Sequence, residues 1–255
     1  MNSPQEAKPP ITRQCVVAPR NIISNVYANI KRKNERLVNR MSKMKINHYV
    51  VGMVQTNCYI VINEETKECF IIDPGAAVAQ LADKIRKDEL TPVAILLTHG
   101  HFDHVAAAKG LAMEFNIKVY AHEAEADTLR DPQKNVSWMV NCKESYDADV
   151  FVKDEEILNL AGFEIKVLHT PGHTEGGCCY YIAEEDVVFT GDTLFAQSVG
   201  RTDFPGGSMS QIVRSIQEKL LTLNEAGKLE TDIMVYPGHN DPTTIETERM
   251  ENPYL

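Results

Sequence analysis

The sequence lacks the long apolar runs that mark membrane proteins. No stretch of its 255 residues approaches the roughly 20 apolar residues that a transmembrane helix requires. No apolar segment of the kind found in secretory signal peptides follows the N-terminus. We therefore expect a soluble, cytoplasmic protein that does not bind membranes.

Cysteine pairs of the CxxC type are also missing. The six cysteines are scattered along a chain that is 43% hydrophobic. A chain of this length and apolar content can form a core without a disulfide framework. We predict free thiols in a reducing compartment.

The short motifs of several large enzyme classes are absent. There is no GxGxxG after a strand-like segment, no Walker-type GK[ST] and no GxSxG. The sequence therefore lacks the motifs that would best support a nucleotide-binding or serine-hydrolase function.

Positive charge is scarce outside the N-terminus. Residues 1–43 carry a net charge of +7, whereas the remaining residues carry −17. An acidic surface cannot neutralise phosphates, so nucleic acid is not the expected partner. The contrast predicts a basic N-terminal extension, residues 1–43, followed by one domain, residues 44–255.

Within that domain, strand-like and helical segments form two series. The first series has expected strands at 45–51, 57–63, 68–73, 93–98 and 118–122, with helices at 78–90 and 104–116. The second has expected strands at 162–170, 178–184, 186–192 and 232–239, with a helix at 210–226. Two clusters of strands separated by helices indicate two sheets packed face to face, with helices outside.

Metal-ligating side chains gather in "THGHFDH", residues 98–104, directly after an apolar strand. His99 and His101 are two positions apart, so in extended backbone they point to the same side. Asp103 and His104 follow where the next helix begins. The segment holds three of the eight histidines in the chain, which indicates a site rather than ordinary surface residues.

Three later strand ends each supply one more candidate: His173 in "TPGHT", Asp192 in "TGDT" and His239 in "YPGH". Five imidazoles and two carboxylates suit a borderline metal such as zinc. Seven donors are too many for one tetrahedral ion, so we predict two ions with a shared carboxylate.

These residues resemble a known family. "THGHFDH" is similar to the HxHxDH signature of the metallo-beta-lactamase superfamily, and "IIDPG", "TPGHT", "TGDTLF" and "YPGH" resemble its other motifs in the same order. The resemblance covers about residues 44–255. It implies an α/β fold, the four-layer αββα sandwich, with the metals at one edge of the sheets.

The resemblance also implies roles for the individual residues. One metal ion would be bound by His99, His101 and His173, and the other by Asp103, His104 and His239. Asp192 would bridge them, and Asp103 and Asp192 would be the catalytic carboxylates. Asp73 in "IIDPG" would fix the orientation of the ligand loop. The expected ions are two divalent metals, Zn²⁺ first, with iron or manganese as alternatives.

Two further segments, "GRTDFPGG" (200–207) and "ERMENPYL", resemble the glyoxalase II-like hydrolases of the short bacterial type. This implies a hydroxyacylglutathione hydrolase-like thioesterase, in which a metal-activated hydroxide attacks a small-molecule thioester. True glyoxalase II proteins carry a further helical domain that binds glutathione. Only sixteen residues follow His239, so the thiol carrier stays open.

Two other functions stay open. "GRTDF" also resembles the persulfide dioxygenases, which keep the ligand motif but use one iron and usually carry alanine where Gly238 stands. A metal-binding module without catalysis is the non-enzyme alternative, and it would close its coordination sphere with protein ligands.

Three residues are candidate substrate contacts. The guanidinium of Arg201 could bind an anionic group, or it could form a structural ion pair with Asp203. Lys143 and Tyr146 lie between the two series of strands, where related enzymes often place substrate contacts.

Overall fold

Strand β2 (Thr56–Asn63) is buried along its whole length, and its alternate side chains face two different apolar layers. Ile60 and Ile62 pack with the helices on one side, whereas Tyr59 and Val61 pack between the sheets. A strand that is covered on both faces requires a nearly continuous apolar run, which "CYIVI" supplies.

The computed structural model describes residues 43–224 and 232–255 and places β2 in a six-stranded sheet. The order is β1 (Met44–Val51), β2, β3 (Glu68–Ile72), β4 (Thr91–Leu96), β5 (Lys118–His122) and β6 (Val150–Val152). Strands β1 to β3 are antiparallel, and β3 to β6 are parallel. This first sheet is therefore mixed.

The second sheet also has six strands, in the order β14 (Thr243–Thr244), β13 (Met234–Pro237), β10 (Val187–Gly191), β9 (Cys178–Ile182), β8 (Phe163–His169) and β7 (Ile157–Leu160). Only β10 and β13 run parallel. A small hairpin of β11 (Leu194–Phe195) and β12 (Ser198–Val199) follows β10.

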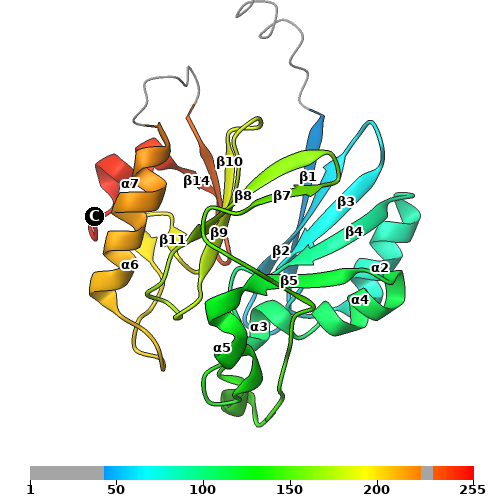
Figure 1. Cartoon of the computed structure of the whole chain (residues 1–255), viewed down its shortest axis with the longest axis horizontal. Helices are drawn as coiled ribbons and strands as arrows, with labels where there is room; N and C mark the ends of the chain where they lie inside the picture. The colour runs from blue at the N-terminus through cyan, green and yellow to red at the C-terminus, as the bar shows by residue number, and fades with distance from the viewer. Residues whose placement is uncertain (1–42, 225–231) are drawn as a thin grey trace, which may run out of the picture. The chain divides into compact units, whose positions relative to one another are not determined.

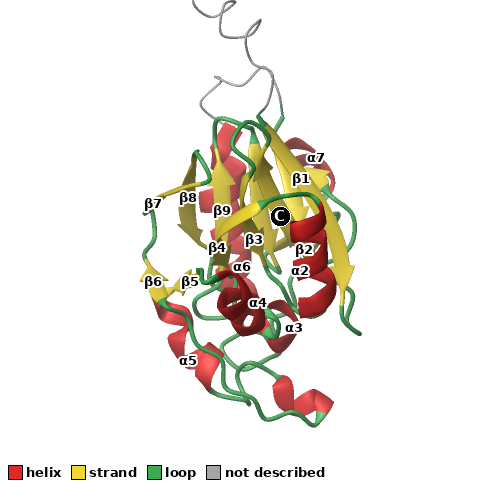
Figure 2. Cartoon of the chain, turned by 90° about the vertical axis from the view of Figure 1, so that its right-hand side faces the viewer, coloured by secondary structure: helices red, strands yellow, loops and turns green. Residues whose placement is uncertain are grey.

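Helices cover the outer face of each sheet (Figure 1). Helices α2 (Val78–Lys87), α4 (Ala108–Phe115) and α5 (Ala126–Arg130) pack on the first sheet, and Figure 2 shows α2 and α4 in front of its strands. Helices α6 (Met209–Ser215) and α7 (Ile245–Glu251) pack on the second, and a π turn (Ile216–Leu220) and a 3₁₀ turn (Leu221–Asn224) extend α6. The predicted αββα sandwich is confirmed.

The helix predicted at 104–116 is interrupted. The structure has a short α3 (Phe102–Val105) and then α4, with Ala106 and Ala107 between them. The backbone N–H of Ala107 donates to the carbonyl of Pro74 instead of to a helical carbonyl. Gly75, which follows Pro74 in the chain, lies so close to the backbone of Asp103 that a Cβ would overlap the Asp103 carbonyl. The "DPG" loop therefore occupies the place of one helical turn.

Several smaller elements were not predicted, among them β6, β7, α5 and α7. Strand β6 has three residues, too few for a recognisable alternation. The 1–43 extension lies, apart from Lys43, outside the described residues, and the domain boundary stays a prediction. In the described part of the chain, no helix is long and apolar enough to cross a membrane. The five described cysteines are free, as predicted.

Candidate metal centre

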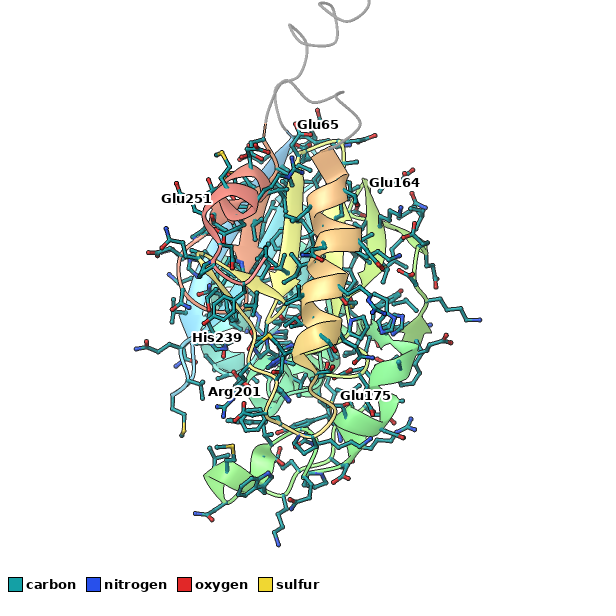
Figure 3. All side chains as sticks on the ribbon, turned by 90° about the vertical axis from the view of Figure 1, so that its left-hand side faces the viewer. Glu65, Glu164, Glu175, Arg201, His239 and Glu251 are labelled. Atoms are coloured by element: carbon teal, nitrogen blue, oxygen red, sulfur yellow. The ribbon has the colours of Figure 1, made fainter. Side chains whose placement is uncertain are left out.

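The predicted ligands lie in loops at one end of the two sheets. His99 follows β4, His173 follows β8, Asp192 follows β10 and His239 follows β13. In Figure 3, His239 and Arg201 lie in the lower half of the molecule, whereas Glu65, in the β2–β3 turn, lies at the top. Loops at the carboxyl ends of strands are where open α/β sheets bind ligands.

Three imidazoles form the first triad: His99, His101 and His173. The ligand atoms of the three lie within 4.8 Å of one another. Nδ1 of His101 lies 3.1 Å from Nε2 of His99 and 3.0 Å from Nε2 of His173. All three side chains are buried, so their nitrogens point at one small volume away from solvent.

Asp103, His104 and His239 form the second triad, also within 4.8 Å of one another. Oδ2 of Asp103 lies 3.3 Å from Nε2 of His239 and 3.5 Å from Nε2 of His104. His104 is fully buried, whereas His239 is partly exposed and gives this triad access to solvent.

Asp192 lies between the two triads. Its Oδ2 is 3.5 Å from Nε2 of His173 and 3.6 Å from Nε2 of His239, one residue from each triad. Its Oδ1 is 3.4 Å from Nε2 of His104 and is a buried oxygen with no hydrogen-bond partner. A buried, unpaired carboxylate oxygen is costly unless a cation lies beside it, so the residues present fit a pair of metal ions.

The charges of the centre also fit metal binding. Burial and the neighbouring imidazoles lower the pKa of His99 and hold that of His101 at about 3. Burial likewise lowers the pKa of His173. For Asp192, burial alone would raise the pKa, but the charge of His104, whose Nε2 lies 3.4 Å away, holds it well below the usual range. Neutral imidazoles and ionised carboxylates are the forms that bind metals.

The histidines of the second triad differ from those of the first, because carboxylates raise the pKa of both His104 and His239 although burial alone would lower it. For His104, burial alone would lower the pKa, but three carboxylates, Asp103, Asp192 and Asp73, raise it well above the usual value. In the metal-free arrangement its proton offsets part of this negative charge. A metal ion must displace that proton before His104 can serve as a ligand.

Asp73, the predicted supporting carboxylate, contacts the ligand loop directly. Its Oδ1 accepts a 2.8 Å hydrogen bond from the backbone N–H of Thr98, and its Oδ2 accepts one of 2.6 Å from the Thr98 hydroxyl. Oδ2 also lies 3.0 Å from Nδ1 of His104. Asp73 thus fixes the His104 ring with Nε2 toward the second triad.

Two further supports were not predicted. Nδ1 of His173 donates a 2.7 Å hydrogen bond to the backbone carbonyl of Arg201. The Asn57 side chain donates to the carbonyls of Pro237 and Asn240, at 3.0 and 2.8 Å, and so holds the loop that carries His239. The sequence does not show which backbone carbonyl will accept a hydrogen bond, so the Arg201 contact could not be predicted. Asn57 could have been predicted, because a polar residue at the start of an apolar strand is unusual and indicates a specific hydrogen-bonding role.

The three candidate substrate contacts have different surroundings. Arg201 forms a two-pronged ion pair with Asp203, with both contacts at 2.7 Å. Tyr146 lines a cavity of about 670 Å³ beside α4, and no predicted metal ligand lines this cavity. Lys143 is exposed in the loop before Tyr146. A role for these residues in substrate binding stays a prediction.

The remaining histidines, His48, His122 and His169, contact residues outside the predicted ligand set. His169 pairs its Nε2 with the carbonyl of Glu175 at 3.0 Å and stacks on His122. His48 lies 2.7 Å from Oδ1 of Asn57 and stacks on Tyr59.

The fold and this cluster together define a class of protein. The family model described as the metallo-beta-lactamase superfamily matches residues 51–239, and the chain belongs to this superfamily. It is a metallo-hydrolase of that class, with His/Asp clusters consistent with a dinuclear metal site.

Among curated relatives, the chain is 38% identical over 214 residues to "Probable metallo-hydrolase YqgX" of Bacillus subtilis, covering 83% of this chain and 98% of the relative. It is 37% identical over 215 residues to "Hydroxyacylglutathione hydrolase GloC" of Haemophilus influenzae, with the same coverage of both chains.

Among solved structures, the BLEG-1 B3 metallo-beta-lactamase is similar, with a TM-score of 0.76, 38% identity and coverage of 83% of this chain and 99% of that one. TTHA1623 in a di-iron-bound form matches with a TM-score of 0.69, 33% identity and coverage of 82% and 100%.

Proposed function

We propose that this protein is a glyoxalase II-like thioesterase that uses two divalent metal ions to hydrolyse small-molecule thioesters. The first triad would hold one ion, the second triad the other, and Asp192 would bridge them. The observation that carries the proposal is the position of Asp192, whose Oδ2 lies within 3.6 Å of one imidazole from each triad. A carboxylate between two cations offsets their repulsion and sets their spacing.

The donor set favours Zn²⁺, because imidazole and carboxylate suit a borderline ion. Iron is the main alternative, since the related TTHA1623 structure is a di-iron form. When bound, such ions act as Lewis acids and lower the pKa of water in the site.

The residues of the chain contribute orientation and charge. Asp73 and the Arg201 carbonyl hold the rings of His104 and His173, so the donor atoms stay fixed when substrate binds. Asp103 and Asp192, both held ionised, neutralise the ions and limit how strongly they bind anionic products.

A thioester is the substrate class that this centre suits. The leaving thiolate is a weak base, with a reference thiol pKa of about 8.5, so its departure needs no protein proton donor. Every imidazole of the centre is committed to a triad, and none is left as a general acid. The relative named hydroxyacylglutathione hydrolase supports a hydroxyacyl thioester of glutathione as the first compound to test.

Gly238 favours two ions over one. A Cβ at this position would lie 2.4 Å from Oδ1 of Asp192 and 2.6 Å from Cε1 of His104. The space that an alanine would fill is therefore kept open between the bridging carboxylate and a ligand of the second triad. This argues for the dinuclear hydrolase and against the mononuclear persulfide dioxygenase.

The test is to purify the protein without added metal, measure bound metals, and assay three reactions. These are hydrolysis of lactoylglutathione, hydrolysis of a chromogenic beta-lactam, and oxygen consumption with glutathione persulfide. We expect about two equivalents of metal and thioester hydrolysis. A single iron with oxygen consumption and no hydrolysis would show that the proposal is wrong.

Asp192→Asn supplies the matched variant, because it keeps the shape and removes the bridging charge. We expect it to lose one metal equivalent together with hydrolysis. Asp149→Asn also removes a carboxylate, one that accepts from the Val119 backbone away from the centre, and should retain both. Equal metal content in the two variants would contradict the bridging role.

A further inference from the structure

Glu125 is a buried carboxylate outside the predicted ligand set. It ends the 3₁₀ turn Glu123–Glu125 that follows β5, and only 1% of the residue is exposed. Its Oε1 accepts a 2.8 Å hydrogen bond from the backbone N–H of Gly100, and its Oε2 accepts one of 3.1 Å from the Thr174 hydroxyl. The Gly176 N–H and the Thr128 hydroxyl also donate to it.

These donors flank all three histidines of the first triad. Gly100 lies between His99 and His101, and Thr174 directly follows His173. The two loops follow strands of different sheets, β4 and β8. A single carboxylate therefore connects the ligand loop of one sheet to the ligand loop of the other.

Glycines of both ligand loops lie against Glu125, and at Gly176 the contact leaves no room for a side chain. A Cβ at Gly176 would lie 2.3 Å from the backbone nitrogen of Glu125 and 2.5 Å from Oε2. At Gly100, a Cβ would lie 3.2 Å from Oε1. The backbone of both ligand loops is thus packed against this one residue.

We propose that Glu125 is a positioning residue that sets the separation of His99 and His101 from His173, and thereby the metal affinity of the first triad. This inference rests on the proposed metal-dependent function. Its physical basis is that a metal site binds tightly only when its donors are held at the coordination distance before the ion arrives.

Glu125→Gln tests the idea with little change of shape. A glutamine has one acceptor oxygen in place of two, and backbone N–H groups cannot accept a hydrogen bond. In either orientation of the glutamine amide, its NH₂ group replaces one carboxylate oxygen. The backbone N–H of Gly100 or of Gly176 then faces that NH₂ group and loses its acceptor. One of the two ligand loops is then released from the contact.

Glu248→Gln is the matched control. Glu248 is also fully buried, and its two oxygens accept from the Thr243 hydroxyl, the Gln197 backbone and the Asn252 amide at 2.6 to 2.8 Å. None of these donors adjoins a predicted ligand in the sequence. Loss of one acceptor should therefore lower the melting temperature in both variants, but only Glu125→Gln should alter the metal site.

The measurements are the melting temperature of the metal-free protein, Co²⁺ affinity by competition with a chelator, and the visible spectrum of the cobalt form. For Glu125→Gln we expect metal binding weaker by roughly 10- to 100-fold and an altered cobalt spectrum. Glu248→Gln should match the parent in both metal readouts. Parent affinity and spectrum in folded Glu125→Gln would overturn the inference.

A second variant covers the case in which Glu125→Gln does not fold. Thr174→Val removes a single hydroxyl donor from Oε2, and we expect a smaller loss of affinity in the same direction, with Thr174→Ser restoring it. If the parent itself binds no Co²⁺, the proposed function fails. If the parent binds it and these variants bind equally well, only the role of Glu125 is wrong.

Discussion

The hydroxyl of Thr56 donates a 2.8 Å hydrogen bond to Oδ2 of Asp103, across 47 positions of sequence. Thr56 is fully buried at the start of β2, and the same carboxylate oxygen faces Nε2 of His239 at 3.3 Å. Burial alone would raise the pKa of Asp103, but the charge of His104 and the hydrogen bonds from His239 and Thr56 hold it at about 2. The first sheet thus orients a carboxylate of the second triad.

Thr56→Val should weaken the second metal site. Valine keeps the shape of threonine but cannot donate, so Asp103 becomes free to rotate away from His239. We expect metal affinity at the second triad to fall by roughly 10- to 100-fold, with the first triad unchanged. Metal content at graded chelator concentrations measures this. Thr56→Ser keeps the hydroxyl and should behave as the parent; an equal loss in both variants would assign the effect to packing.

Gly238→Ala should convert the centre from two ions toward one. The added methyl group would meet Asp192 and His104 at less than 3 Å, so one of them must move. The backbone of Gly238 does not require a positive φ, so the effect comes from the contact rather than from strain. We expect loss of about one metal equivalent and a cost in stability of about 1–3 kcal/mol from overpacking.

Gly110→Ala is the control for this prediction. Gly110 lies in helix α4, and an added Cβ would meet the side chain of Val78 at 2.9 Å and no predicted ligand. Its metal content should equal that of the parent. Two metal equivalents in Gly238→Ala would remove the argument that glycine is needed at this position.

The seven predicted ligands could be found from sequence because they gather in the loops and the short helix that follow four apolar strands. The strand ends of the two sheets lie at the same end of the sandwich, so residues such as His104 and His239 lie close together although they are 135 positions apart in the chain. The sandwich followed from the same pattern, with strands in two series and amphipathic helices between them. These features depend on local sequence and on general rules of sheet packing.

Supporting residues other than Asp73 and Asn57 depend on tertiary packing and could not be predicted from these patterns. Glu125 stands in "EAEAD", among acidic residues of which most are exposed, and only the folded chain shows that it is the buried one. Tyr146 was predicted as a substrate contact from its place between the two halves, and that role stays a prediction, but its place in the lining of the cavity beside α4 depends on the folded chain. The break between α3 and α4 likewise arises from a contact with the distant loop at Pro74.

Arg201→Ala should leave substrate affinity nearly unchanged. The guanidinium is paired at two points with Asp203 and lies 3.8 Å from the centre of the Phe204 ring, so binding a substrate anion would require breaking these contacts. The Arg201 carbonyl that holds His173 is backbone and survives the substitution. We expect KM for lactoylglutathione to change by less than about twofold.

Asp203→Asn completes that experiment, because it frees the guanidinium without removing it. If Arg201 does bind an anionic group of the substrate, KM should fall in Asp203→Asn and rise in Arg201→Ala. That pair of results would restore Arg201 as a substrate contact and assign Asp203 a competing role.

The last prediction concerns the stacked imidazoles of His122 and His169, whose ring centres lie 4.1 Å apart with the planes 9° from parallel. Burial and, after it, the neighbouring imidazole of His169 lower the pKa of His122 from 6.5 to about 4, while Glu123 and Asp154 act in the opposite direction. The folded protein therefore binds fewer protons here than the unfolded chain between these two values. The stabilising contribution of neutral His122 is fully present above pH 6.5 and is lost as the pH falls toward 4.

His169→Gln tests the coupling, because glutamine can still donate to the Glu175 carbonyl but carries no charge. We expect the pKa of His122 to rise toward its usual value, so the loss of stability on acidification should become smaller and should be complete at a higher pH. NMR titration of the His122 ring, assigned with His122→Gln, and urea unfolding between pH 4 and 7 measure the two effects. His48→Gln removes an imidazole that stacks on Tyr59 instead, so the His122 titration should be unchanged. If His169→Gln also leaves that titration unchanged, burial alone lowers the pKa of His122 and the stacked partner contributes nothing to it.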